Sequence, residues 1–263
     1  MIANYHTHTV RCHHADKVED AAFVEAAIGA GLQVLGFSEH APWPYETDTW
    51  YKDARMDHAQ FDEYVSAVRR LQKQYEGKIR IYLGLECEYY PKYLPWLSSV
   101  RDRLDYVILG NHWPETDEFG AKYMYYSTTP EELKRYTDIQ VEAMESGLFC
   151  YAAHPDFGFS SWQKADEVFE TCARTICKAA KRLEMPLEYN LYGLEKADLR
   201  GHPGLGYPCA SFWEIAAKEG CDAVIGYDAH YLRHLQNTKY RDGAEKFLHG
   251  LGLNVLETLP GLE

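Results

Sequence analysis

The sequence predicts an α/β protein with a distorted (β/α)7 barrel, similar to a TIM barrel. Short β-rich runs alternate with segments of helical apolar spacing, as parallel strands and their crossover helices do. A polar or ionisable residue follows nearly every predicted strand, from the first to the last. A doubly wound sheet builds its site from a few strands at one switch point, whereas a barrel brings every strand end to one mouth. A length of 263 residues also suits one such barrel.

The first half of the chain begins this alternation. Residues 2–8 suit a short opening strand, and residues 18–30 carry apolar side chains at helical spacing that ends at Gly29 and Gly31. Residues 33–38 (QVLGFS) are apolar enough for a buried parallel strand. The same criteria predict a loop rich in Pro and Trp over residues 41–56 and a helix over residues 57–75. They then predict a strand over 79–85, a short helix over 92–103 and a strand over 105–109.

The second half of the chain continues with helices and strands in turn. Pro130 suits the first turn of a helix, where no N–H donor is needed. The predicted helices cover residues 130–145, 165–183, 210–218 and 243–249, and the predicted strands cover residues 149–153, 186–189, 223–226 and 254–259. No linker-like tract and no obvious repeat interrupts this pattern, so we expect residues 1–263 to form one domain.

Composition and charge exclude several classes of function. The net charge of −13 argues against a nucleic-acid polymer as a partner, because phosphate backbones require a basic surface. No apolar run reaches the ~18 residues that a membrane-spanning helix needs, and no signal peptide is evident, so we expect no membrane association. The 7 cysteines are scattered without a CxxC pair, which favours reduced thiols and a cytoplasmic location.

Side chains that bind metal ions well are concentrated at the predicted strand ends. His6 and His8 are two residues apart in a strand, which puts both imidazoles on the same face. Asp228 and His230 repeat this spacing after a later strand. Taken singly, each such residue is better explained as structural, but together they indicate a metal site at the C-terminal mouth of the barrel. The candidate ligands are His6, His8, His14, His40, Glu86, His112, His154, Asp228 and His230.

Glu86 has a special place in this set. Hydrolysis with divalent ions commonly uses a pair of ions about 3.5–4 Å apart. A carboxylate can bridge such a pair because its two oxygens reach different ions, and Glu86 is the carboxylate in the middle of the set. We therefore expect Glu86 and Asp228 to be essential for catalysis.

Short motifs around these residues carry a resemblance to a known family. They are HTHT at 6–9 with His14, SEH ending at His40, GLE ending at Glu86, NH at 111–112, AHP around His154 and GYDAH at 226–230. The combination closely resembles the polymerase-and-histidinol-phosphatase (PHP) superfamily, and most of all its histidinol-phosphatase type. The motifs extend from residue 6 to residue 230, so the resemblance covers nearly the whole chain.

This resemblance implies a fold, a cofactor and an activity. The fold would be a distorted seven-stranded barrel that holds three divalent metal ions, which would be Zn, Mn or Fe. The activity would be that of a metal-dependent phosphomonoesterase that converts L-histidinol phosphate to L-histidinol and phosphate in histidine biosynthesis, by attack of a metal-bridging hydroxide. His13, Asp156 or a metal-bound water would protonate the leaving group. The implied ligand sets are His6, His8, Glu86 and Asp228 for one ion, Glu86, His112 and His154 for a second, and His14, His40 and His230 for a third.

One stretch departs from the family pattern. Histidinol phosphatases of this type usually carry a motif like NTSGLRK after the sixth strand, whereas residues 190–196 read NLYGLEK. Glu195 therefore stands where an arginine is expected, which puts L-histidinol phosphate in doubt as the substrate but not hydrolysis itself. The basic residues that could contact the phosphate instead, in competition with a role as solvated surface charges, are Arg11, Lys196 and Arg200.

The predicted loop at 41–56 is rich in aromatic side chains. Trp43, Tyr45 and Trp50 are consistent with two roles. They would bind a planar substrate ring over the mouth, or they would cover the rim of the barrel as ordinary packing.

The sequence leaves three other functions open. The same site could act on another small phosphoester, such as a nucleotide or a sugar phosphate. An amidohydrolase-type barrel, which cleaves C–N bonds, also uses an HxH pair, but it binds at most two ions and leaves His14, His40 and His230 without a function. The third is a non-catalytic metal-binding or regulatory module, and the complete ligand set argues against it.

Overall fold

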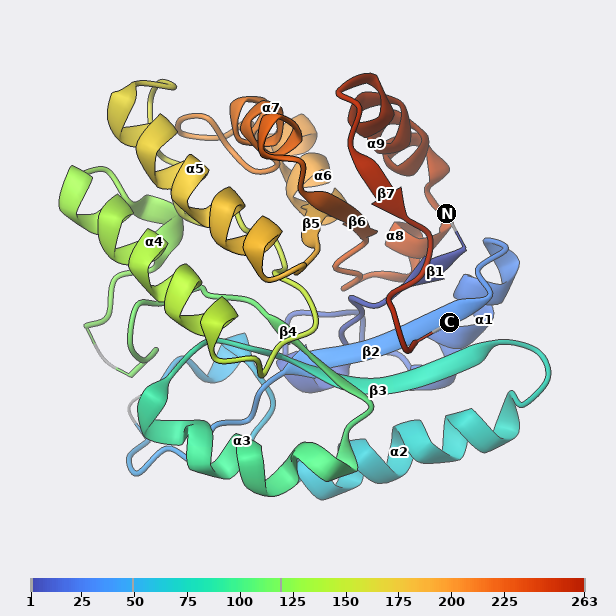
Figure 1. Cartoon of the computed structure of the whole chain (residues 1–263). Coiled ribbons are helices and arrows are strands. Elements are labelled where there is room, and N and C mark those ends of the chain that lie inside the picture. Colours follow the sequence, from blue (N-terminus) through green and yellow to red (C-terminus); the bar gives the residue numbers. More distant parts are fainter. Residues whose placement is uncertain (1, 49, 119, 263) are drawn as a thin grey trace.

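Parallel strands form two sheets in the part of the chain that the computed structural model describes, which is residues 2–48, 50–118 and 120–262 (Figure 1). The first sheet contains, in spatial order, β1 (Ala3–Asn4), β2 (Val34–His40), β3 (Arg80–Cys87) and β4 (Tyr106–Leu109). The second contains β5 (Leu187–Asn190), β6 (Asp222–Gly226) and β7 (Asn254–Leu256). Every neighbouring pair is parallel, as right-handed crossovers through helices require.

Single-residue bridges join the two sheets into a distorted barrel. Ala152 pairs with Leu109 of β4 on one side and with Leu187 of β5 on the other. Thr7, just after β1, pairs with Ala229, just after β6. The barrel is thus closed at the ends of the strands, where the candidate ligands lie, and the predicted fold class is confirmed.

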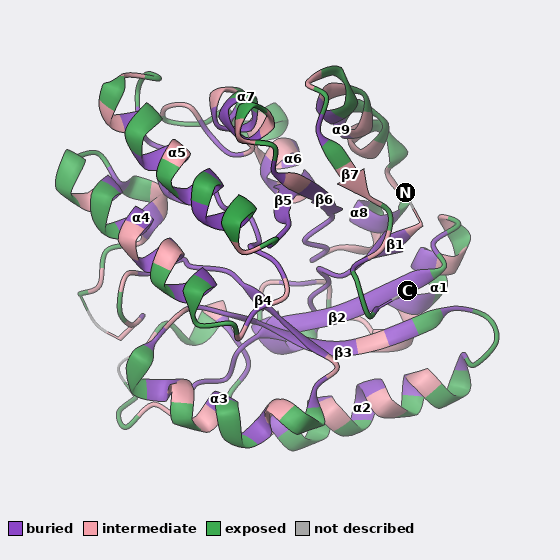
Figure 2. Cartoon of the chain, in the orientation of Figure 1, coloured by how far each residue is buried: buried purple, intermediate pink, exposed green. Residues whose placement is uncertain are grey.

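Helices cover the outer faces of both sheets (Figure 1). Phe61, Tyr64, Val68 and Leu71 give α2 a buried face, while its other side is exposed (Figure 2). Within the described ranges, no helix is long and apolar enough to cross a membrane. The helices are α1 (Asp20–Gly29), α2 (Phe61–Gln74), α3 (Leu94–Val100), α4 (Pro130–Glu145), α5 (Glu167–Arg182), α6 (Leu191–Arg200), α7 (Ala210–Glu219), α8 (Leu232–Gln236) and α9 (Thr238–Gly250).

Several predicted elements differ from the observed ones: β1 covers only Ala3–Asn4 of the strand predicted over 2–8, and neither α6 nor α8 was predicted. The predicted strand at 149–153 is reduced to the bridge residue Ala152, although its backbone bonds to both neighbours: Leu109 N donates to Tyr151 O at 3.0 Å, and Ala152 N donates to Pro186 O at 3.1 Å. Helix α6 has no counterpart among the predicted elements. It begins without a loop because Asn190, the last residue of β5, also caps it by accepting the N–H of Gly193 at 2.8 Å.

Alternate strand residues fill the barrel below its mouth. Tyr5, Tyr106 and Tyr151 belong to one buried cluster there, and residues of opposite orientation pack outward against the helices. The ring of Tyr106 lies over Gly36 and Gly84, where a Cβ atom would collide with it. Large rings therefore close the lower interior, and the polar side chains are confined to the mouth.

Candidate metal centre

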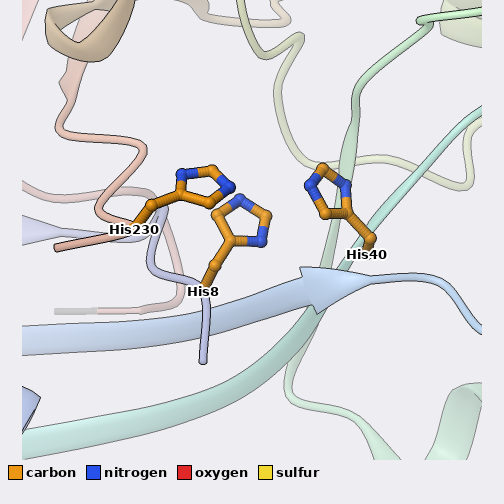
Figure 3. A group of neighbouring side chains, drawn as sticks. All are labelled: His8, His40 and His230. Atoms are coloured by element: carbon orange, nitrogen blue, oxygen red, sulfur yellow. The ribbon is translucent and has the colours of Figure 1, made fainter. Parts of the chain in front are cut away.

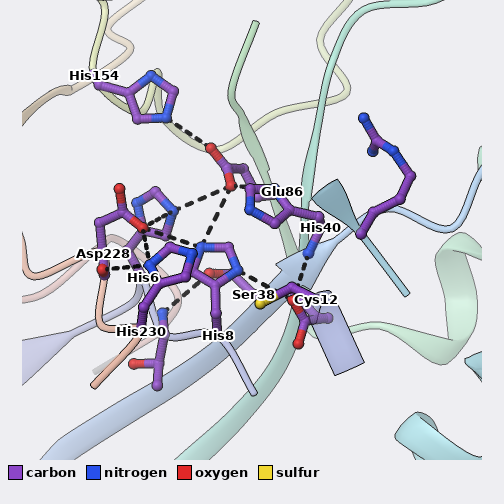
Figure 4. Close-up of polar contacts among 12 residues, drawn as sticks. His6, His8, Cys12, Ser38, His40, Glu86, His154, Asp228 and His230 are labelled. Carbon is purple, nitrogen blue, oxygen red and sulfur yellow. Dashed lines mark hydrogen bonds and ion pairs between the residues drawn. The ribbon is translucent and has the colours of Figure 1, made fainter. Parts of the chain in front are cut away.

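The strand ends bring the candidate ligands together at the mouth (Figure 4). His40 is the last residue of β2 and pairs in register with Glu86 of β3. His6 and His8 follow β1, and Asp228 follows β6. Every one of these five side chains is buried. The predicted convergence at one mouth is therefore present.

Glu86 lies at the centre of the cluster, and its two oxygens face different histidines. Oε1 lies 2.7 Å from His154 Nε2 and 3.6 Å from His112 Nε2. Oε2 lies 2.9 Å from His40 Nδ1 and 3.4 Å from His6 Nε2. A carboxylate placed in this way fits a role in which each oxygen would face a different cation.

Asp228 completes the side of the cluster formed by the HxH pair. Its Oδ1 lies 3.1 Å from His8 Nε2 and 3.5 Å from His6 Nε2. Asn190 donates from Nδ2 to the other oxygen, Oδ2, at 3.2 Å. Asp228 has a φ of 49°, and His154 has a φ of 31°, which are uncommon values outside glycine. Backbone strain of this kind is found where a side chain must be held in one direction.

A second group of imidazoles lies beside the first. Figure 3 shows His8, His40 and His230, whose nitrogens lie within 4.8 Å of one another. His230 Nε2 and His14 Nε2 are only 2.8 Å apart. The Nδ1 atom of each of these two rings faces backbone carbonyl oxygens and therefore carries the proton. Two unprotonated nitrogens at this distance repel each other unless a cation lies between them.

The cluster fits bound cations in a further respect. Buried polar atoms are nearly always hydrogen-bonded, and an exception requires an explanation. In the described residues, the exceptions include His6 Nε2, His8 Nε2, Glu86 Oε2, His154 Nδ1 and Asp228 Oδ1. Most of these atoms point into one cluster. Imidazole nitrogens and carboxylate oxygens suit divalent ions such as Zn²⁺, Mn²⁺ and Fe²⁺.

Three buried glutamates behind the cluster were missing from the sequence prediction. Glu188 Oε1 lies 2.8 Å from His6 Nδ1, and Glu39 Oε1 lies 3.2 Å from His8 Nδ1. In the same way, Glu88 Oε1 lies 3.1 Å from Nδ1 of a third imidazole, that of His112. Such carboxylates select the tautomer that leaves Nε2 free for a metal ion. A charged residue inside an otherwise apolar predicted strand is the signal that could have identified Glu188.

Burial and neighbouring charges set the protonation of the site. Burial opposes ionisation of Glu86, but the surrounding imidazoles, that of His40 foremost, hold the pKa of its carboxyl well below the ordinary value. Burial lowers the pKa of His40 to about 3, so its imidazole is neutral, as a metal ligand must be. Burial also favours the neutral form of His8, but Asp228 and Glu39 raise its pKa to about 9. A divalent ion would replace the proton on His8.

A cavity of about 90 Å³ opens directly onto this cluster. One wall is aromatic, with contacts that run from Trp113 through Tyr123 and Phe157 to Tyr207. Lys196 is the cationic side chain of the lining, and its Nζ lies 3.9 Å from the centre of the Tyr192 ring. The lining residues are His14, His40, Ala54, His112, Trp113, Tyr123, His154, Phe157, Tyr192, Lys196, Tyr207, Asp228 and His230.

The other predicted substrate contacts lie outside this lining. The guanidinium of Arg11 forms a fork with Asp20 and Glu63, at 2.9 and 2.8 Å. Arg200 is exposed at the end of α6. The structure therefore places only Lys196, of the three predicted basic residues, in the cavity.

The two predicted proton donors are also outside the lining. His13 is exposed, with a φ of 67° at the end of a short 3₁₀ turn. Asp156 is buried, and burial raises the pKa of its carboxyl to about 7. Its Oδ2 accepts hydrogen bonds from Cys209 N at 2.6 Å and from Trp213 Nε1 at 3.1 Å, so it ties its loop to α7.

Glu195 points away from the cavity. Its Oε1 accepts from Arg233 Nε at 3.2 Å, and its Oε2 lies 3.2 Å from His234 Nε2. The other ring nitrogen of His234 accepts the N–H of His230, also at 3.2 Å. The residue that departs from the family motif thus supports a candidate ligand from behind.

The aromatic side chains of the loop at 41–56 pack at the rim. Trp43 is buried, with its ring stacked on Tyr93, and Tyr45 stacks on Trp50. None of the three predicted ring-binding residues is among those that line the cavity. The packing role is therefore the one observed.

Comparisons with known proteins agree with this geometry. The family model described as "PHP domain" matches residues 4–190. A protein named "Probable histidinol-phosphatase" from Deinococcus radiodurans is 28% identical over 242 residues, which is 87% of this chain and 86% of that protein. The "Histidinol-phosphatase" of Bacillus subtilis is 31% identical over 134 residues, which is 49% of this chain and 50% of that protein.

Among solved structures, the chain resembles a histidinol phosphate phosphatase of Lactococcus lactis, solved with zinc, L-histidinol and phosphate. The TM-score is 0.73 with 18% sequence identity, over 99% of this chain and 97% of that one. At this identity the likeness is one of fold.

Proposed function

Because this chain belongs to the PHP domain family, we propose that it is a metal-dependent phosphomonoesterase that hydrolyses L-histidinol phosphate to L-histidinol and phosphate. The observation that carries this proposal is the position of Glu86, whose two oxygens face separate groups of imidazoles. The names of the relatives and the chemistry of the cavity support the choice of substrate. We also propose that residues 1–263 act as one hydrolase domain in the cytoplasm, where the seven free thiols would stay reduced.

We assign three ions to the cluster, with Zn, Mn or Fe as the metal. The imidazole nitrogens and carboxylate oxygens that lack a hydrogen bond support this number. When bound, such ions lower the pKa of a coordinated water and neutralise the charge of a phosphoryl group. The proposed ligand sets are His6, His8, Glu86 and Asp228; Glu86, His112 and His154; and His14, His40 and His230.

The chain itself supplies binding and orientation around this centre. The ammonium group of Lys196 would pair with a non-bridging phosphate oxygen, because it is the cation of the cavity lining. The wall of Trp113, Tyr123, Phe157 and Tyr207 would hold the ring of the leaving group against its flat faces. The small volume of the cavity would exclude bulk water from the reacting atoms.

The experiment that tests this function is phosphate release by the purified protein after reconstitution with Zn²⁺, Mn²⁺ or Fe²⁺. L-Histidinol phosphate is compared with a panel of nucleotide and sugar phosphates and with C–N substrates. We expect turnover of L-histidinol phosphate far above that of the panel. Preference for another phosphoester would change the substrate but keep the chemistry, whereas activity only on C–N substrates would overturn the phosphatase assignment.

The variant Glu86→Gln tests the central carboxylate. It keeps the shape of the side chain but removes the charge that lies between the two groups of imidazoles. We expect near-complete loss of phosphate release, with an unchanged circular dichroism spectrum. Substantial activity in the folded variant would contradict the proposed mechanism.

A further inference from the structure

One buried arginine connects the rim of the cavity to the candidate metal ligands. Arg55 is only 1% exposed, and it ends the segment 51–55, which borders the cavity at Ala54. Its guanidinium donates to Glu88 Oε1 at 2.9 Å and Oε2 at 3.1 Å, and to Ala41 O at 2.9 Å. Its Nε donates to Asp117 at 2.9 Å. All the donor groups of this side chain are thus directed to fixed partners.

The first connection leads to His112. Glu88 accepts the fork from Arg55 and is also the carboxylate that faces His112 Nδ1 at 3.1 Å. Trp43 donates from Nε1 to the same carboxylate at 3.1 Å. The orientation of His112 therefore depends on a carboxylate whose own position Arg55 fixes.

The second connection leads to His14. Asp53, two residues before Arg55, has a backbone oxygen 2.9 Å from His14 Nδ1. This contact keeps the other nitrogen of the ring directed at His230. Ala54, which lies between Asp53 and Arg55 in the sequence, lines the cavity. The segment held by Arg55 is thus both part of the cavity wall and a support for a second ligand.

We propose that Arg55 is a positioning residue for the metal centre. By holding the segment 51–55 against Glu88, it sets the imidazoles of His112 and His14, which belong to two different ligand sets. This role rests on the proposed metal site but goes beyond it. It means that the position of the segment 51–55 and the binding of two of the ions depend on each other. A buried ion pair with a purely structural role would affect folding and leave metal affinity unchanged.

The test uses the conservative variant Arg55→Lys. A lysine keeps the positive charge but cannot form the fork with both oxygens of Glu88 while it also reaches Asp117. The metal-free full-length protein is titrated with Zn²⁺ against a competing chelator dye, and the melting temperature of the metal-free form is recorded. Loss of a carboxylate or its support behind a ligand typically weakens metal binding by about 10- to 100-fold. In Arg55→Lys we expect this loss of Zn²⁺ affinity at two of the three ion sites and little change at the third.

The chain offers a matched control in Arg69. It lies on helix α2, away from the cavity, and its Nη1 donates to both oxygens of Asp105, at 2.8 and 2.9 Å. Arg69→Lys should leave every Zn²⁺ dissociation constant unchanged. Protease digestion of the metal-free forms gives an independent readout, because Arg55→Lys should speed cleavage within 51–55 and Arg69→Lys should not.

The outcomes separate this inference from the proposed function. If the unaltered protein binds no Zn²⁺, the metal site itself fails. If it binds Zn²⁺ and Arg55→Lys binds it equally well, the role of Arg55 is overturned while the metal site stands. If Arg55→Lys does not fold, the isosteric Asp117→Asn decides, because it removes the charge that faces Arg55 and keeps an oxygen that can accept the hydroxyl of Tyr45. We expect an intermediate loss of affinity from Asp117→Asn, and unchanged affinity would overturn the proposal.

Discussion

At the residue scale, most imidazoles of the cluster have one nitrogen held and one directed inward. Carboxylates hold the Nδ1 atoms of His6, His8 and His112, and backbone carbonyl oxygens hold those of His14 and His230. His40 and His154 are exceptions: Nδ1 of His40 faces Glu86, and Nδ1 of His154 has no hydrogen-bond partner. The held nitrogen fixes the tautomer, and so the direction of the free lone pair is a property of the fold rather than of the metal.

Lys196 permits a prediction about substrate binding. The variant Lys196→Met keeps much of the side-chain length and removes the charge that we assign to a phosphate oxygen. A charge-assisted hydrogen bond contributes about 1.5–3 kcal/mol, so kcat/KM should fall by roughly 10- to 100-fold. Steady-state kinetics with L-histidinol phosphate measures this effect. Arg200→Met is the control on the same helix, and a larger loss from it than from Lys196→Met would contradict the assignment.

The candidate ligands could be predicted because most of them stand just after a strand with its own local pattern. Their supports could not. Glu188 lies 182 residues from His6 in the sequence, and Glu39 lies 31 residues from His8. Such pairs exist only once the barrel brings distant strands together. The direction of Glu195 was likewise beyond the sequence, because it depends on the position of α8 behind α6.

At the scale of elements, the apolar spacing defined the long helices well, and caps explain their starts. The predicted helix at 130–145 coincides with α4, where Thr129 and Glu132 form a capping box. The predicted helix at 165–183 contains α5, which starts later because Asp166 caps it. Short elements were harder to predict: the strand expected at 149–153 is reduced to a bridge at Ala152, and a run this short has too little periodicity to fix its extent.

Asp166 permits a prediction for α5. Its side chain accepts the N–H of Phe169 at 3.1 Å, and this bond helps to hold the pKa of the carboxyl below its ordinary value of 3.8. The charged form therefore stabilises the fold fully above pH 3.8, and this contribution is lost as the pH falls through the lower folded-state pKa. At pH 7, Asp166→Ala should reduce the free energy of unfolding by about 1 kcal/mol.

Urea unfolding from pH 2 to pH 7 measures this effect. The control is Asp166→Asn, which keeps an acceptor for the N–H but cannot ionise. Its difference from the unaltered protein should disappear at the acidic end of the range. A difference that stays constant with pH would show that the charge of Asp166 does not contribute.

At the scale of the whole molecule, the barrel is closed in different ways at its two ends. The mouth is closed by the pairing of Thr7 with Ala229, next to the candidate ligands. At the other end, the C-terminal segment packs on the interior rings. Tyr5 donates from its hydroxyl to Leu262 O at 2.6 Å and accepts from Leu259 N at 3.1 Å. Stability and metal binding are therefore assigned to opposite ends of the same strands.

This division can be tested with Leu259→Ala. Leu259 is 1% exposed in the interior cluster, and truncating such a side chain costs about 2–5 kcal/mol. Urea unfolding of the metal-free protein should show this loss, while Zn²⁺ affinity of the folded protein stays unchanged. Leu199→Ala, at a position 68% exposed, should change neither quantity appreciably. A fall in Zn²⁺ affinity in Leu259→Ala would mean that the two ends are coupled.

Metal removal should affect the whole molecule, because the cluster joins strands of both sheets. His40 and Glu86 come from the first sheet, and Asp228 follows β6 of the second. An ion held between them would bind the folded chain only, so at a free concentration 100 times its dissociation constant it would add about 2.7 kcal/mol to the free energy of unfolding. Chelation should therefore lower the melting temperature measured by calorimetry, and added Zn²⁺ should restore it. In Glu86→Gln the same chelation should have a much smaller effect, because the carboxylate that joins the ligand sets has lost its charge. Equal shifts in both proteins would mean that Zn²⁺ stabilises the fold from a different place.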